Sequence, residues 1–347
     1  MAVEKRVTIK RVAREAGVSP QTVSRVVNNH PDVSRETRQR VQHVINRLSY
    51  EPSLIARTLI QGHSRILGVV GAGLEYFGPS RTLSGIERQA DELGYTVQLH
   101  LVHQPESSEV GHLWRELTSR HVDGIIWAVP EIGNNRSWIS EVAIQSSLPI
   151  VFLSMRPDPN LSVVAVDNRS GGRMATEHLL ANGYRSIGLI TGPAGWWEVR
   201  ERRSGWEEAL RAAGGVIEEQ LVVEGDWMPA SGEQGLRRLL EQRPDVDAVF
   251  VCNDQMALGA LQAACALGRQ APEELALVGF DDIPEAAYFQ PPLSTISQDM
   301  VELGRSAVRE LCRVIEESEQ NKTLVQSKAI LFQPQLIVRK SSVAHHN

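Results

Sequence analysis

Apolar residues in the first 50 positions recur three and four residues apart, which predicts short amphipathic helices. Thr8 precedes the first such run and Gly17 ends it, because glycine enters a left-handed turn at little cost. Ser19 and Pro20 can begin a second helix, with the serine as its N-cap. Ser34 can cap a third. Two short helices around a glycine turn, braced by a third, are typical of a helix-turn-helix fold.

The outward face of the second helix carries side chains that can read DNA. Gln21 offers an amide suited to adenine and Arg25 a fork suited to guanine, while Thr22 and Ser24 can reach phosphates or base edges. A small three-helix bundle whose polar face is merely hydrated is the alternative interpretation. We expect residues 1–50 to form an all-α DNA-binding domain.

From position 65 onward, short apolar runs typical of buried strands alternate with helical patterns. One series begins near Ile66 and a second near Gly171. Repeated strand–helix units imply parallel sheets with helices on both faces. Two such series predict an α/β core of two lobes, with a ligand held between them at the carboxyl ends of the strands.

Domain boundaries follow from these patterns. We expect the DNA-binding head at 1–50, a hinge helix or linker at 51–64, an effector-binding and dimerisation core at 65–340, and a flexible tail at 341–347. Lobe 1 is expected at about 65–167 and 297–325, and lobe 2 at about 168–296 and 326–340. The late segments 293–296 and 300–315 are also expected to cross back and complete the first lobe.

Polar and aromatic residues follow several predicted strands of the second series. Arg202, Trp227, Asn253 and Asp281 together provide a guanidinium fork, an aromatic plate, an amide and a carboxylate. A polyhydroxylated sugar needs this mixture of groups. Each residue also has a structural alternative, and Asp254 is expected to cap the next helix.

Charge is distributed unevenly along the chain. Through Gly62 the chain has 11 basic and 5 acidic residues, whereas the remainder has 25 and 37. A basic head on an acidic body is expected of a nucleic-acid binder with a separate regulatory domain. Hydrophobic residues make up 42% of the 347 positions, and no apolar run approaches the roughly 18 residues of a membrane span.

Other classes of site are poorly supported. The three cysteines are widely spaced, which argues against a disulfide framework and a cysteine zinc site, so a cytoplasmic location fits best. The loop after Gly71 lacks the third glycine of a dinucleotide-binding motif, and no phosphate-binding loop or nucleophile elbow occurs. We therefore predict no catalysis, no metal and no cofactor.

The segment Val12–Asn28 resembles the DNA-binding head of the lactose-repressor (LacI/GalR) family. The resemblance continues through Leu48–Pro52 and returns at Arg202–Trp206, Asn253–Ala260 and Val278–Asp282, so it covers essentially the whole chain. It implies a periplasmic-binding-protein-like core and a ligand-responsive transcriptional regulator, expected to be a repressor. It also implies that a hinge leucine wedges into the DNA minor groove, which kinks the duplex.

The resemblance and the helix pattern together assign two sets of residues. The DNA-binding set is Thr8, Ser19, Pro20, Gln21, Thr22, Ser24, Arg25, Asn28, Ala56 and Leu59. The ligand-binding set is Phe77, Pro79, Ser170, Glu198, Arg202, Trp227, Asn253, Asp281 and Gln298.

The expected partners are double-stranded operator DNA, a small-molecule effector and a second copy of the chain. A pseudo-palindromic operator needs two heads, and the last residues, Val338–Asn347, carry no heptad repeat, so we expect a homodimer as the final assembly. The effector is expected to be a small, possibly galactoside-like sugar. A purine or protein co-effector is the alternative within the same class. A sugar receptor without DNA function and a carbohydrate-processing enzyme are the rival classes.

Overall fold

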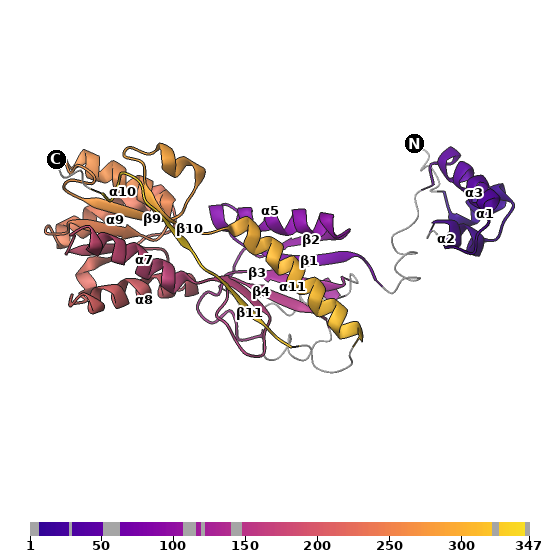
Figure 1. The fold of residues 1–347 in the computed structure, drawn as a ribbon, viewed down its shortest axis with the longest axis horizontal. Helices are drawn as coiled ribbons and strands as arrows, with labels where there is room; N and C mark the ends of the chain where they lie inside the picture. Colours follow the sequence, from indigo (N-terminus) through magenta and orange to yellow (C-terminus); the bar gives the residue numbers. More distant parts are fainter. Residues whose placement is uncertain are drawn as a thin grey trace. The chain divides into compact units, whose positions relative to one another are not determined.

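The computed structural model describes residues 7–27, 30–50, 63–106, 116–118, 122–139, 148–320 and 326–343. The chain divides into two compact units, Met1–Arg65 and Ile66–Asn347 (Figure 1). The predicted DNA contacts Asn28, Ala56 and Leu59 lie outside the described residues, as does most of the expected hinge. No helix in the described segments has the length and apolar character needed to cross a membrane.

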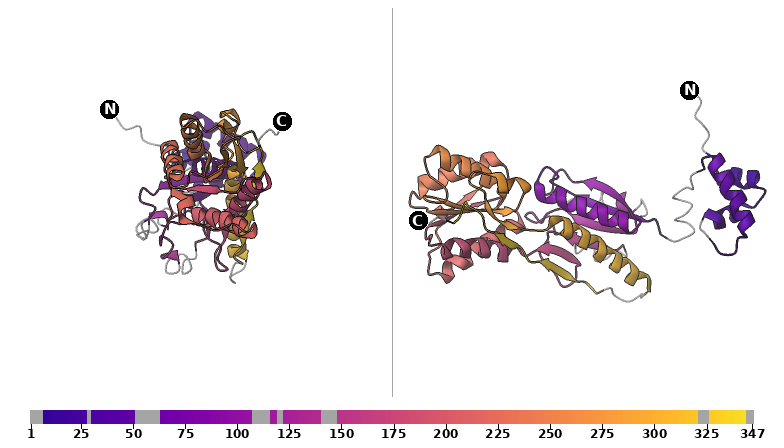
Figure 2. Two further views of the ribbon diagram at one scale, coloured as in Figure 1. Left: turned by 90° about the vertical axis from the view of Figure 1, so that its left-hand side faces the viewer. Right: turned by 45° about the horizontal axis from the view of Figure 1, so that its top comes forward.

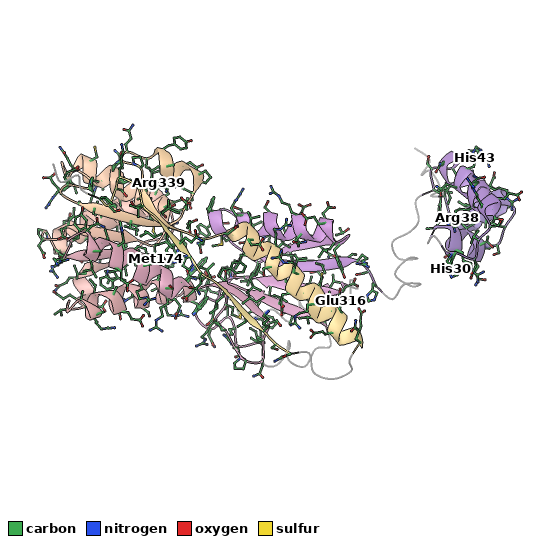
Figure 3. All side chains as sticks on the ribbon, in the orientation of Figure 1. His30, Arg38, His43, Met174, Glu316 and Arg339 are labelled. Carbon is green, nitrogen blue, oxygen red and sulfur yellow. The ribbon has the colours of Figure 1, made fainter. Side chains whose placement is uncertain are left out.

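The described part of the first unit contains the helices α1 (Ile9–Ala16), α2 (Pro20–Val27) and α3 (Arg35–Arg47). Gly17 ends α1 in a left-handed conformation, with φ at 63°. The Ser34 hydroxyl accepts a hydrogen bond from the backbone N–H of Thr37, which caps α3. Arg38, labelled in Figure 3, donates to the carbonyl oxygen of His30 at 2.6 Å and so fixes the connection that precedes α3. The apolar residues join these helices around one small core.

The predicted capping pattern is mostly correct. The Ser19 hydroxyl accepts a hydrogen bond from the Thr22 backbone N–H at 3.1 Å. Thr8 occupies the N-cap position of α1, but its side chain makes no capping hydrogen bond. The helix-turn-helix geometry therefore depends on the serine caps and the glycine turn more than on Thr8.

In its described residues the second unit contains two sheets (Figures 1 and 2). In spatial order the first sheet contains β2 (Thr96–Leu101), β1 (Ile66–Gly71), β3 (Gly124–Ala128), β4 (Ile150–Leu153), β5 (Val163–Val166) and β11 (Ala329–Phe332). The second contains β7 (Val222–Glu224), β6 (Ile187–Thr191), β8 (Ala248–Val251), β9 (Ala276–Asp281), β10 (Ser294–Ser297) and β12 (Gln335–Ile337). Neighbouring strands of the two sheets run parallel, except β10 and β12, which are antiparallel.

The central strands are buried because apolar side chains cover both of their faces. Helices α5 (Phe77–Glu92) and α11 (Met300–Gln320) pack with the first sheet. The second sheet packs with α7 (Asn168–Ala181), α8 (Trp197–Ala212), α9 (Pro229–Gln242) and α10 (Asp254–Ala266). Two 3-10 turns, Glu219–Leu221 and Pro284–Tyr288, complete this lobe.

Two expectations about the lobes are wrong. The segment 326–340 does not belong wholly to lobe 2, because β11 pairs with β5 in the first sheet. The run at 293–296 does not complete the first lobe, because β10 pairs with β9. Both strands are only four residues long, and pairing partners elsewhere in the chain decide which sheet they join.

The expected tail at 341–347 is ordered at its beginning. Ser341 and Ser342 are fully buried, and the Ser341 hydroxyl donates to the carbonyl oxygen of Leu277 at 2.7 Å. The Ser294 backbone N–H in turn donates to the Ser341 hydroxyl at 2.8 Å. These bonds fasten the end of the chain to lobe 2 because two buried backbone groups depend on them.

Candidate functional site

A cavity lies between the two lobes, at the carboxyl ends of strands from both sheets. From the first sheet, Gly71, Ala128 and Leu153 at the ends of β1, β3 and β4 line it. From the second, Asn253 follows β8 and Asp281 ends β9. The cavity holds about 880 Å³ of unfilled space, part of it open to solvent. Small-molecule sites in α/β proteins occur at this place in the topology.

The second lobe supplies a buried guanidinium at this cavity. Arg202 is 5% exposed, and its Nε donates to the Asn168 side-chain oxygen at 2.8 Å. Its Nη1 donates to the carbonyl oxygen of Cys252. The guanidinium carbon lies 3.7 Å from the centre of the Phe280 ring. These contacts hold the arginine rigidly and leave Nη2 as the nitrogen for which no protein partner is recorded among the described residues.

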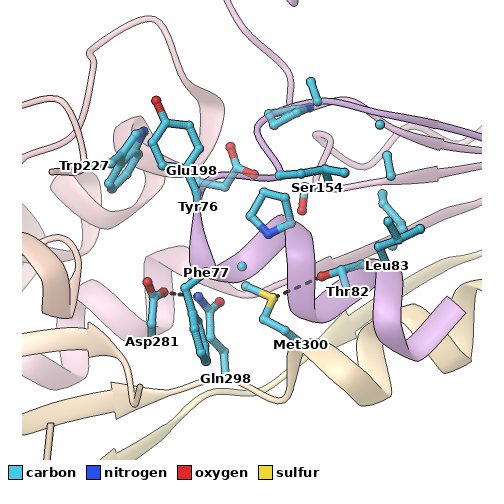
Figure 4. A pocket seen from close by; sticks show the side chains of 18 of the residues that line it. Tyr76, Phe77, Thr82, Leu83, Ser154, Glu198, Trp227, Asp281, Gln298 and Met300 are labelled. Atoms are coloured by element: carbon cyan, nitrogen blue, oxygen red, sulfur yellow. Dashed lines mark hydrogen bonds between the residues drawn. The ribbon is translucent and has the colours of Figure 1, made fainter. Parts of the chain in front are cut away.

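Asp281 and Gln298 form the neighbouring polar pair. The Gln298 amide donates to the Asp281 carboxylate at 2.5 Å (Figure 4). Burial raises the pKa of Asp281 to about 6, while the Arg202 charge and the Gln298 amide act in the opposite direction. Asp281 also has a φ of 111°, which is strained for a residue with a side chain. Strain held at a cavity wall is typical of a functional site.

Several buried polar atoms at the cavity have no hydrogen-bond partner among the described residues. They are Glu198 Oε2, Trp227 Nε1, Gln255 Oε1 and Gln298 Oε1. An unsatisfied buried polar atom costs about 1–3 kcal/mol. Three of these atoms are acceptors and one is a donor, so a ligand that offers several hydroxyl groups would satisfy them.

Among these groups, Glu198 is the one whose pKa is shifted. Glu198 is 9% exposed, and burial raises the pKa of its carboxyl group to about 7. The negative charge of Glu131 acts in the same direction, whereas Arg202 and the Ser154 hydroxyl oppose it. Near neutral pH this side chain therefore exchanges between an acceptor-only carboxylate and a carboxyl group that can also donate.

Trp227 provides the aromatic wall. It has a φ of 76°, and the Asn253 amide donates to its carbonyl oxygen at 3.0 Å. The Asn253 side-chain oxygen accepts the backbone N–H of Met256, so Asn253 is the N-cap of α10. Asp254 is therefore not the cap, contrary to expectation. Its carboxylate accepts from the Thr295 hydroxyl at 2.6 Å within the lobe.

The first lobe gives the cavity an apolar end. Figure 4 shows Trp227 and Asp281 at one end and Thr82 and Leu83 at the other. Further apolar lining comes from Val69, Leu74, Phe77, Pro79, Ile86, Leu99 and Met300. A ligand that fills the whole cavity would present hydroxyl groups to the second lobe and carbon surface to the first.

The structure brings together eight of the nine predicted ligand residues. Phe77, Pro79, Glu198, Arg202, Trp227, Asn253, Asp281 and Gln298 all line the cavity. Ser170 does not; it lies in the first turn of α7, where its backbone N–H donates to the Asp167 carboxylate at 2.9 Å. The predicted set omitted Tyr76, Trp196, Gln255 and Ser154, which also line the cavity. The two tryptophans at 196–197 suggest an aromatic wall, but no local pattern marks Gln255 or Ser154.

On the head, the predicted base-reading residues share one accessible surface. Pro20, Gln21 and Arg25 on α2 are exposed, whereas Val23 and Val26 of the same helix are buried. The Ser19 and Thr22 hydroxyls lie 2.9 Å apart and remain exposed. The helix thus presents an amide and a guanidinium outward, as major-groove readout requires.

Comparison with known proteins places these features in one family. Residues 8–53 match the bacterial regulatory proteins of the lacI family, and residues 176–342 match a periplasmic binding protein-like domain. The transcriptional repressor PurR of Haemophilus influenzae is 33% identical over 96% of this chain and 98% of its own length. The lactose operon repressor of Escherichia coli K12 is 33% identical over 89% of this chain and 85% of its own.

Solved structures agree with the sequence matches. A Lac repressor dimer bound to operator and the anti-inducer ONPF superposes with a TM-score of 0.89 at 31% identity, covering 98% of this chain and 100% of that one. A complex of the regulator CelR with cellobiose has a TM-score of 0.71 at 32% identity, covering 97% and 100%. The relatives are transcriptional repressors and not enzymes, which confirms the predicted class. With a DNA-binding head and a two-lobed core both matched, this chain belongs to the LacI family of DNA-binding transcriptional repressors.

Proposed function

We propose that this repressor binds a pseudo-palindromic operator as a homodimer, in the cytoplasm where that DNA lies, and that a neutral sugar in the interlobe cavity controls its affinity for the operator. The sugar is proposed because buried side-chain oxygens and the Trp227 N–H at the cavity lack hydrogen-bond partners among the described residues. A ligand with several hydroxyl groups can bond to them from several directions. Ligand binding across two lobes favours one relative orientation of them. A coupling of about 1–3 kcal/mol would change operator affinity roughly 5–150-fold.

The aromatic geometry favours a sugar over a purine. A flat base is held best between near-parallel rings, whereas the recorded ring pairs at the cavity are edge-on. The Tyr76 and Trp196 rings meet at 81°, and the Trp196 and Trp227 rings at 72°. A lone indole face suits the C–H face of a pyranose. A purine stays the competing effector, and the ligand screen includes it.

The screen measures melting temperature with a panel of monosaccharides, disaccharides and purine bases. We expect at least one saccharide to raise it, because a ligand that binds only the folded protein stabilises it. Arg202→Ala and Gln298→Leu should each abolish the shift. The melting temperature without ligand checks that each variant is folded. A shift produced by hypoxanthine or guanine and by no saccharide would replace the sugar with a purine.

Operator binding needs its own experiment. Sequences enriched from random DNA by the full-length protein supply the operator, and titration at two salt concentrations separates specific from non-specific binding. Arg25→Ala should weaken the selected site by about tenfold or more relative to random DNA, the range of one lost base contact. Arg11→Ala, on exposed α1, is the matched control and should affect both DNAs alike. Enrichment of no sequence would refute operator recognition.

The homodimer is supported by exposed apolar side chains in lobe 2. Tyr288 is 85% exposed and Leu258 on α10 is 42% exposed. The backbone N–H of Ile283 donates to the Asp254 carboxylate, so the two segments carrying these residues are neighbours. We assign this face to a second copy of the chain. Tyr288→Asp should halve the mass measured by sedimentation, while Val216→Asp, at a 74% exposed site, should leave it unchanged.

A further inference from the structure

A second cavity adjoins the one described above, on the far side of an aromatic partition. It holds about 1270 Å³ of unfilled space, part of it open to solvent. Tyr76 and Trp196 line both cavities, as do Ala72, Leu74 and Pro130. We call the first cavity the inner cavity and this one the outer cavity. The two cavities therefore share one boundary, and the rings of Tyr76 and Trp196 form part of it.

The aromatic side chains form a row from one cavity into the other. The Trp227 ring, at the inner end, lies 5.5 Å from the Trp196 ring, and the Trp196 ring lies 6.2 Å from the Tyr76 ring. Trp196 is held by a β-bridge to Ile132, which lines the outer cavity. Because the rings are set at an angle to each other, each offers its own apolar face. A pyranose unit has an apolar C–H face that can pack against one such ring.

Charge at the outer cavity limits which ligand fits. Among its described lining residues the charged groups are Glu75 and Glu106, with His103 as the only other ionisable side chain besides Tyr76. Burial and then the nearby carboxylates of Glu75, Asp226 and Glu106 raise the pKa of Tyr76.

One guanidinium beside the outer cavity, that of Arg200, is already engaged. Arg200 donates to the carbonyl oxygen of Gly195 at 2.7 Å and lies 3.8 Å from the carboxylate of Glu131. Carboxylates without a free cation among the lining residues disfavour an anionic ligand such as a sugar phosphate or a uronic acid.

We propose that the outer cavity binds the second unit of a neutral disaccharide whose first unit occupies the inner cavity, with Trp196 and Tyr76 against the glycosidic junction. This proposal rests on the sugar effector proposed above. It adds that the sugar has two units and no charge. The carboxylates at the outer cavity accept hydrogen bonds from the hydroxyl groups of the second unit. Affinity then comes from both units, so a monosaccharide should bind more weakly than the disaccharide that contains it.

Calorimetry with matched probes tests this. The pairs are glucose with cellobiose, galactose with lactose and galactose with melibiose, titrated into the full-length dimer. For at least one pair we expect the disaccharide to bind about tenfold tighter or better, as one stacked and hydrogen-bonded unit can provide. Glucose 6-phosphate and glucuronic acid should bind more weakly than glucose.

Substitutions at Glu75 separate the two cavities, because Glu75 lines the outer cavity and not the inner one. Glu75→Trp fills space there and should remove the disaccharide advantage while leaving monosaccharide affinity within about twofold. Glu75→Gln keeps the size and should retain most of the advantage. Tyr76→Phe keeps the ring and should also retain it, whereas Tyr76→Ala should lose it.

The outcomes distinguish this proposal from the one before it. Equal affinity for mono- and disaccharide in every pair, unchanged by Glu75→Trp, would overturn the outer site and leave the sugar effector standing. A sugar phosphate that binds more tightly than the neutral sugar would also overturn it. Binding of no saccharide at all would refute the sugar effector and this proposal together.

Discussion

Glu198 offers a quantitative test of the cavity, because its charge is buried where no described protein group satisfies Oε2. Replacing it by glutamine keeps the shape and removes the charge. The ordinary pKa of a glutamate is 4.5, and burial raises that of Glu198 to about 7. The folded protein therefore holds this proton more tightly than the unfolded chain does. Stability is lost as the pH rises through this window.

The magnitude follows from the two pKa values. Each factor of ten in a proton equilibrium corresponds to about 1.4 kcal/mol, so ionisation of Glu198 costs about 3 kcal/mol of stability at pH 8 and well under about 1 kcal/mol at pH 4.5. Glu198→Gln should recover most of this cost at pH 8 and very little at pH 4.5. The substitution should also weaken any ligand whose hydroxyl donates to Oε2.

Chemical denaturation of the full-length protein at pH 4.5, 6 and 8 measures the gain, read from a probe in the core. Glu201→Gln, on the same helix and partly exposed, is the matched control and should change stability little at each pH. A gain that is the same at all three pH values would show that packing and not charge is responsible. A loss of stability at pH 8 would refute the reasoning entirely.

Three further substitutions test how the site and head are held. A Cβ at Gly192 would lie 2.3 Å from the Trp227 ring, so Gly192→Ala should displace the ring and weaken saccharide binding about tenfold; unchanged affinity in calorimetry would contradict this. Ser34→Ala removes the cap of α3 and should cost about 1 kcal/mol, seen as faster hydrogen exchange of α3 amides and not of the core. Arg339→Ala removes the 2.7 Å ion pair with Asp282 and should lower the melting temperature of the core, whereas preserved melting would show that the pair contributes nothing.

The head could be predicted closely because its signals are local. Helix caps, a glycine turn and helical spacing act over three or four residues, and α1, α2 and α3 begin and end near where those signals stand. The cavity could be predicted only in part. Arg202, Trp227 and Asp281 follow strands, and parallel strands bring their ends to one edge, so their convergence followed from the alternation itself.

Other residues of the cavity could not be predicted from the sequence. Gln255, on α10, and Ser154, which follows β4, line one cavity only because the two lobes face each other. Ser170 was predicted to bind the ligand, but it does not line the cavity. It lies in the first turn of α7, where its backbone N–H donates to the Asp167 carboxylate. Residues on one helix turn differ in direction by roughly 100°, so a correct helix does not by itself select which side chain faces a ligand.

Most of the alternation of strands and helices, the basic head and the family could be predicted from the amino-acid sequence, since these depend on short-range patterns and on motifs that are contiguous in the chain. The strands β5, β11 and β12 could not. The tertiary structure decided which sheet received β10 and β11, the burial of Ser341 and Ser342, and the aromatic row between the two cavities. Each of these depends on partners tens to hundreds of residues away. Local periodicity records that a segment is apolar or polar, but not which distant surface covers it.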